Sequence, residues 1–65
     1  MQIRLNAENF NVDENTTVAD IVAQQNFVPP FAVAVNTIFI PKNCYAQTVL
    51  HEGDMIDVVN PVAGG

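Results

Sequence analysis

The chain has 65 residues, enough for one small domain with a thin core and little room for a catalytic cleft. Hydrophobic residues make up 49% and charged residues 14%, a balance that excludes an intrinsically disordered chain. Two basic residues, Arg4 and Lys42, stand against seven acidic ones, for a formal net charge of −5. Binding to nucleic acid or to an anionic membrane surface needs clustered Lys and Arg, so both classes are excluded.

Cysteine usage and hydropathy indicate the compartment. A single cysteine, Cys44, cannot form an internal disulfide, so the chain is not a disulfide-stapled secreted scaffold. The first residues show no basic region followed by an apolar run, and no stretch approaches the roughly 20 apolar residues of a membrane span. We therefore expect a cytoplasmic protein.

The first element in chain order is a hairpin. Residues 2–6 alternate polar and apolar side chains, which is typical of a strand with one buried face. Phe10 and Val12 continue the alternation after a polar stretch. We expect the turn near Ala7 and Glu8, although no Asn-Gly pair marks it.

A helix follows. Thr16 or Thr17 can cap its start, and Thr17 with Asp20 has the spacing of a capping box in its aspartate form. Three apolar residues then recur at helical spacing, namely Val18, Ile21 and Val22. The Pro29-Pro30 pair bars any continuation of the helix, because proline lacks the backbone donor.

The second half of the chain reads as short strands. The predicted strands are AVAV and IFI on either side of Asn36-Thr37, TVL as a very short strand, and MIDVV at the end. Between them, KNCYAQ suggests irregular or single-turn structure and HEGD a polar turn. In the last strand, Ile56 and Val58 share one face.

This order of elements predicts an α+β fold of two layers, with one helix packed across a curved mixed sheet of four to five strands. A right-handed crossover from the hairpin through the helix would place the third strand parallel to one of the hairpin strands. The β-grasp arrangement satisfies these limits.

Catalytic motifs are mostly missing. The chain has no serine, and Cys44 and His51 are most simply an incidental small apolar residue and a solvated turn residue. We interpret Asp54 and Asp57 as solvated acids, since further ligands for a cation are not evident. No zinc-ligand set or glycine-rich phosphate loop is present. We expect no bound cofactor or metal and no self-sufficient enzyme.

The end of the sequence, NPVAGG, carries no charged side chain. It is either a frayed terminus or a reactive arm. Six extended residues reach about 20 Å, and glycines, which lack Cβ, can enter a narrow channel. Pro61 would stiffen the exit from the last strand. A carboxylate in such a channel becomes electrophilic once another enzyme converts it to a mixed anhydride.

The chain as a whole resembles the ThiS family of sulfur carrier proteins of thiamine biosynthesis, which has the ubiquitin-like β-grasp fold. The matching segments are the MQIRLN opening, TTVADIV, AVAVN followed by IFIP, HEGD before MIDVV, and the PVAGG end. The resemblance implies a β-grasp domain over residues 1–59 and a flexible reactive tail over 60–65.

The resemblance also implies a mechanism. A ThiF-like adenylating enzyme would use MgATP to form an acyl-adenylate on the carboxylate of Gly65. Sulfur from a cysteine desulfurase persulfide would replace AMP, and a ThiG-like thiazole synthase would take it into the thiazole ring. Gly64, Ala63 and Val62 would enter the active sites of these partners. The chain itself would be a protein cosubstrate, monomeric when free.

Docking needs a surface as well as a tail. Phe39, Met55 and Val59 are expected to form an apolar patch on the exposed sheet face, unless they pack against a loop or each other. The acidic surplus, with Glu52 among it, either steers a basic partner surface or serves solubility alone.

Three alternatives stay open at this point. The chain could carry sulfur for molybdopterin, as the small subunit of molybdopterin synthase does. It could be a ubiquitin-like modifier attached to lysines. It could also be a plain interaction domain with an inert tail.

Overall fold

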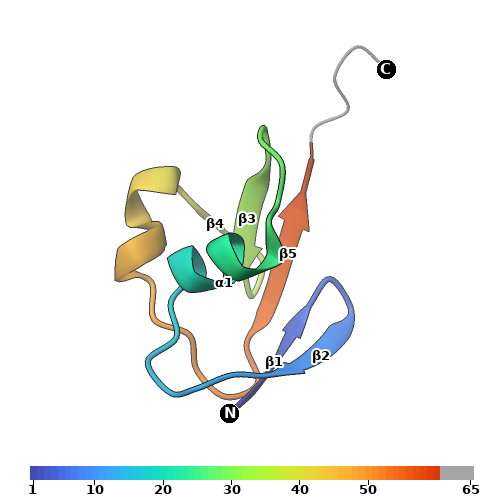
Figure 1. Ribbon diagram of the computed structural model, residues 1–65, viewed down its shortest axis with the longest axis vertical. Coiled ribbons are helices and arrows are strands. Elements are labelled where there is room, and N and C mark those ends of the chain that lie inside the picture. Colours follow the sequence, from blue (N-terminus) through green and yellow to red (C-terminus); the bar gives the residue numbers. More distant parts are fainter. Residues whose placement is uncertain (61–65) are drawn as a thin grey trace.

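Two β-hairpins flank the last strand of the chain in a single mixed sheet. The computed structural model describes residues 1–60. Its elements are β1 (Gln2–Leu5), β2 (Glu8–Asn11), α1 (Val18–Gln25), β3 (Ala32–Val35), β4 (Ile38–Ile40), the 3₁₀ helix η1 (Lys42–Gln47) and β5 (Met55–Val59). The strand order is β2-β1-β5-β3-β4, with α1 packed across one face (Figure 1). The expected α+β β-grasp fold is confirmed.

The sheet is mixed because β1 and β5 run parallel, whereas the other neighbouring strands are antiparallel. The third strand, β3, runs in the same direction as β2 but pairs with neither strand of the first hairpin, since β5 lies between. The last strand of the described residues, β5, is therefore the central one, and Asn60 follows it at the middle of the sheet.

The first hairpin turns one residue earlier than its pattern predicted. Asn6 and Ala7 form the turn, with φ of 48° and 70°, and Glu8 is already the first residue of β2. Two-residue hairpin turns of this kind need positive φ at both positions, which asparagine tolerates better than most residues. The amide oxygen of Asn6 also accepts a hydrogen bond from Val58 N at 2.9 Å.

Helix α1 begins with the predicted capping box. Asp20 N donates to Thr17 Oγ1 at 3.2 Å, and Thr17 N donates to Asp20 Oδ2 at 3.0 Å. Thr17 is thus the cap, whereas the hydroxyl of Thr16 donates to a carbonyl in the preceding loop. Asn26, in the left-handed region at φ 54°, ends the helix before the Pro29-Pro30 pair is reached.

The segment between η1 and β5 is not the short strand that TVL predicted. It makes one isolated bridge, Thr17 to Val49, and Leu50 N donates to Thr16 O at 2.8 Å. The segment runs beside the start of the helix, where there is no strand edge to extend. KNCYAQ, which was expected to be irregular or a single turn, forms the six-residue 3₁₀ helix η1.

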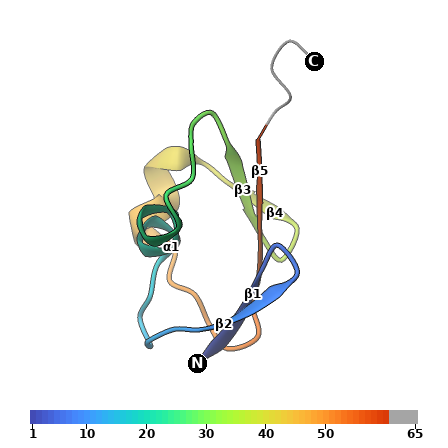
Figure 2. The same ribbon diagram turned by 45° about the vertical axis from the view of Figure 1, so that its right-hand side comes forward.

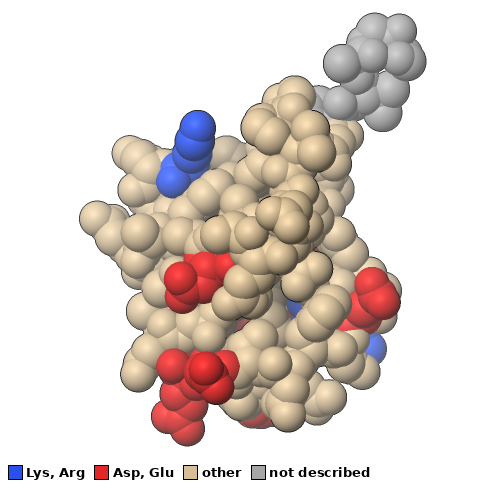
Figure 3. Space-filling view, viewed as in Figure 1, with Lys and Arg blue, Asp and Glu red and all other residues tan. Residues whose placement is uncertain are grey.

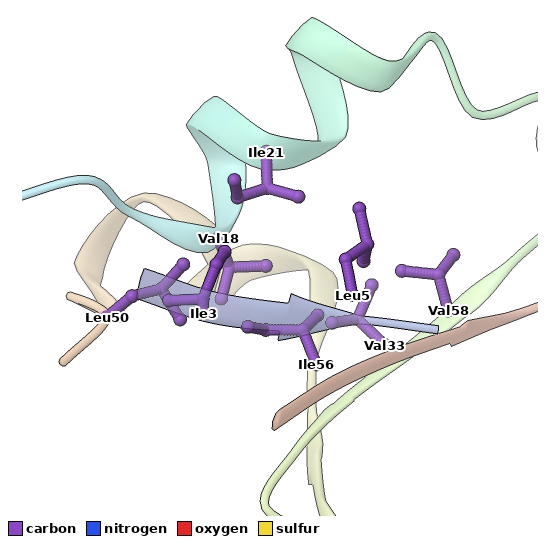
Figure 4. Packing of buried hydrophobic residues seen from close by; sticks show 8 residues of the cluster. All are labelled: Ile3, Leu5, Val18, Ile21, Val33, Leu50, Ile56 and Val58. Atoms are coloured by element: carbon purple, nitrogen blue, oxygen red, sulfur yellow. The ribbon is translucent and has the colours of Figure 1, made fainter. Parts of the chain in front are cut away.

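The core is formed between the sheet and the helix. Figure 4 shows side chains from β1, β3, β5, α1 and the segment before β5 pointing toward one another. Among residues 1–60, the eight buried hydrophobic residues are Ile3, Leu5, Val18, Ile21, Val33, Leu50, Ile56 and Val58. Alternation along β5 places Ile56 and Val58 in this core and turns Met55, Asp57 and Val59 to the opposite face.

Candidate functional site

The candidate docking surface is the sheet face that no helix covers. Figure 2 shows α1 and η1 on the same side of the sheet. On the other side, the register places Phe39 opposite Ala34, Ala34 opposite Asp57, and Ala32 opposite Val59. These five residues, together with Val33, line an open depression of about 240 Å³.

The structure brings two of the three predicted patch residues together. Phe39 is 64% exposed and Val59 is 59% exposed, so neither is covered by a loop. Both line the depression. Met55 is also exposed, but it lies at the other end of β5, opposite Arg4, and does not line the depression. Asp57 stands between Met55 and Val59 on the same face. The apolar part of this face is therefore centred on Phe39 and Val59.

Two residues of this surface, Ala32 and Ala34, were missed by sequence reasoning. Their small side chains lie between Phe39 and Val59 and leave the depression open. A signal existed in the sequence, because alternation in AVAV puts both alanines on the face opposite the buried Val33. We name the surface formed by Ala32, Ala34, Phe39 and Val59 the sheet patch.

The predicted reactive tail begins at the end of β5. The side-chain amide of Asn60 donates to Val28 O at 2.8 Å and to Pro30 O at 2.7 Å. Figure 1 shows that β5 ends at the same end of the molecule as the loop between α1 and β3. Four residues predicted to act in the tail, Val62, Ala63, Gly64 and Gly65, lie outside the described residues.

The remaining polar candidates are structural or solvated. The His51 side chain is 79% exposed, as expected of a turn residue, and Cys44 is half-buried in η1. Asp54 is not a solvated acid, which corrects the prediction, since its side chain is only 15% exposed. Its carboxylate accepts hydrogen bonds from Asn36 Nδ2 at 2.9 Å and from His51 N at 2.7 Å. Asp57 is exposed, as predicted.

Among residues 1–60, no group of three or more His, Cys, Asp or Glu side chains is placed to hold a metal ion. In the same part of the chain, none of the helices has the length and hydropathy needed to cross a bilayer. On the face seen in Figure 3, the acidic side chains lie in the middle and lower parts of the view, away from the upper end, where β5 ends in Figure 1.

Comparison with known proteins agrees with this architecture. The fold and the uncovered sheet face define a ubiquitin-like β-grasp protein. A solved structure of the thiamine biosynthesis protein ThiS from Geobacter metallireducens superposes with a TM-score of 0.85, covers all of both chains and is 19% identical in sequence. That likeness supports the fold.

The family assignment rests on sequence. The model of the ThiS family matches residues 3–65, and the chain belongs to this family. A thiazole synthase from Magnetococcus marinus is 35% identical over 66 aligned residues, which include the whole of this chain and 20% of that protein. The chain thus spans about a fifth of the length of this curated relative.

Proposed function

We propose that the chain is a sulfur carrier for the thiazole ring of thiamine, with Gly65 as the residue that carries the sulfur. The observation that carries the proposal is the ThiS family match, which runs from β1 through the last glycine. A β-grasp domain with an uncharged Gly-Gly tail suits this role. The domain supplies a docking surface, and the glycines, having no Cβ, pass through a narrow channel.

The chemistry begins with activation of the terminal carboxylate. A carboxylate oxygen of Gly65 attacks the α-phosphorus of ATP in a ThiF-like enzyme, pyrophosphate leaves, and an acyl-adenylate forms. The terminal sulfur of a cysteine desulfurase persulfide then attacks the acyl carbon, and AMP leaves. A thiol cleaves the resulting disulfide and leaves the thiocarboxylate on the carrier.

Transfer of the sulfur requires a third protein. A ThiG-like thiazole synthase accepts the tail and takes the sulfur into the ring. The likeness to one stretch of a thiazole synthase supports this partner over a molybdopterin synthase. ATP and Mg²⁺ are held by the adenylating enzyme, and the carrier acts as a cosubstrate, a monomer when free, in the cytoplasm.

The proposed docking site is the sheet patch, with Met55 as a more distant contact. The patch lies on the uncovered face at the strand from which the tail departs. Exposed apolar surface on a small domain is typical of an interaction site. A partner that covers Phe39 and Val59 would hold the domain while Val62, Ala63, Gly64 and Gly65 enter its active site.

Intact mass spectrometry tests the proposal. The protein is incubated with ATP, Mg²⁺, a ThiF-like enzyme and a cysteine desulfurase charged with cysteine, plus a thiol. We expect an adenylate adduct without the desulfurase and, with it, a mass gain equal to replacement of one oxygen by sulfur. The matched control lacks Gly65 and should show neither change, because its new terminus ends one residue short. An unchanged wild-type mass would refute the carrier function.

The same reaction separates the alternatives. Thiocarboxylated protein supplied to a ThiG-like enzyme with its carbon substrates should release its sulfur and return to the original mass. Sulfur release only to a molybdopterin synthase large subunit, or appearance of the chain in amide linkage to lysines, would refute the thiazole assignment.

A further inference from the structure

The ladder between β3 and β5 ends just where the tail begins. Its last pair is Ala32 with Val59. One step further in the same register, Phe31 would stand opposite Asn60, and a second step would set Pro30 opposite Pro61. Neither proline has an N–H, so backbone pairing cannot continue past this point. Any further contact between these two segments has to come from side chains.

The side chain of Asn60 makes that contact. Its amide nitrogen has two hydrogens, and it donates to two carbonyls of the facing loop, Val28 O at 2.8 Å and Pro30 O at 2.7 Å. From residue 28 to residue 30 the loop offers three carbonyls but only one backbone N–H, because two of its residues are prolines. The side chain of Asn60 supplies two donor hydrogen bonds to this donor-poor loop, both of them in an exposed setting.

The residues on either side of the loop that receives these bonds are packed against the core. Phe27 and Phe31 flank it, both are partly buried against the core cluster, and their ring centroids are 5.9 Å apart. Phe31 also stacks on Tyr45 of η1, with centroids 6.4 Å apart and ring planes 12° from parallel. The two carbonyls therefore belong to a short exposed loop whose flanking residues are packed on the domain.

We propose that Asn60 is a positioning residue for the reactive tail. Its two side-chain hydrogen bonds to Val28 O and Pro30 O, which we call the clamp, tie the first residue of the tail to the 28–30 loop. The clamp thereby sets the position and direction from which the last five residues start. The proposal rests on the carrier function proposed above and adds a residue whose part in it is to present the tail.

Loss of the clamp should weaken binding of the tail by the adenylating enzyme and leave the rate of the adenylation step unchanged. Without it, one more residue must be ordered when the tail enters the adenylating enzyme, and ordering one residue of backbone costs enough to weaken binding about tenfold. Once the tail is seated, Gly65 meets the same groups. We therefore expect KM for the carrier to rise about tenfold, with kcat changed less than twofold.

The experiment compares Asn60→Ala and Asn60→Asp with wild type in adenylation kinetics, measured by pyrophosphate release. Asn60→Asp keeps the shape of the side chain but puts an acceptor where both donors were, so it should lose the clamp at least as fully as Asn60→Ala. Asn11→Asp is the matched control, an exposed asparagine on edge strand β2 with the same change of charge. It should keep wild-type KM and kcat. A wild-type KM in both Asn60 variants, or a loss confined to kcat, would overturn the proposal.

An NMR measurement on the free protein decides separately whether the clamp exists. In Asn60→Asp, the carbonyl carbon shifts of Val28 and Pro30 and the amide shift of Phe31 should move, and those of Asn11→Asp should stay at wild-type values. Unmoved shifts in Asn60→Asp would overturn the clamp, whatever the kinetics. A wild-type protein that is never adenylated would instead refute the carrier function, and the carbonyl shifts would still decide on the clamp.

Discussion

At the scale of single residues, the side chain of Asp54 joins two segments of the chain through hydrogen bonds. Its carboxylate accepts from Asn36 Nδ2 and from His51 N, and Asn36 Oδ1 in turn accepts from Met55 N at 3.0 Å. We predict that Asp54→Ala lowers the free energy of unfolding by about 2 kcal/mol, because two donors lose a charged acceptor. Urea unfolding at unchanged m-value measures this loss.

Asp57→Ala is the control for that experiment, since it removes the same charge from an exposed side chain. Its effect should stay within about 0.5 kcal/mol. Equal losses in the two variants would mean that the change of net charge, rather than the hydrogen bonds, causes the destabilisation.

The contacts of Asp54 also show which hydrogen bonds can be predicted from a sequence and which cannot. The capping box between Thr17 and Asp20 was predictable because its partners are three residues apart and its geometry is that of one helical turn. Asp54 meets Asn36 across 18 residues, and Asn60 meets Pro30 across 30. Such pairs depend on strand register, which no local pattern in these segments specifies.

At the scale of elements, both hairpins close without glycine. Asn36 and Thr37 have φ of 50° and 72°, matching the pair Asn6 and Ala7 in the first hairpin. A β-branched residue such as threonine is strained at positive φ. We predict that Thr37→Gly raises the free energy of unfolding by about 0.5–1 kcal/mol, because relief of strain outweighs the larger entropy of the unfolded glycine. Chemical denaturation measures the gain.

Thr37→Ala is the comparison variant, since alanine keeps a Cβ at the same φ and should gain less than glycine. A Thr37→Gly protein less stable than wild type would contradict the account of the turn. The strands of the first hairpin were predictable from alternation and those of the second from short apolar, β-branched runs, whereas the first turn was placed one residue late. Asparagine as the first turn residue in both hairpins was the signal available for it.

At the scale of the whole molecule, the fold class followed from the order of elements, since one helix and a few short strands allow few two-layer arrangements. The position of β5 in the middle of the sheet did not, because short strands of similar composition do not specify their neighbours. That central position is what brings Val59 beside β3 and so assembles the sheet patch with Phe39. Met55, chosen from the same alternation, lies apart because the strand carries it to the other end of the sheet.

This arrangement gives a test of the docking face on a folded protein. We predict that Phe39→Asp raises KM for adenylation at least tenfold and leaves the free energy of unfolding within about 0.5 kcal/mol, because the ring is mostly in solvent. Ile38→Asp is the matched control, an apolar residue of the same strand, 66% exposed, whose side chain alternates to the other face. It should leave KM within twofold of wild type. If both variants raised KM equally, the partner would be responding to the β4 edge or to the net charge. The sheet patch would then not be the docking site.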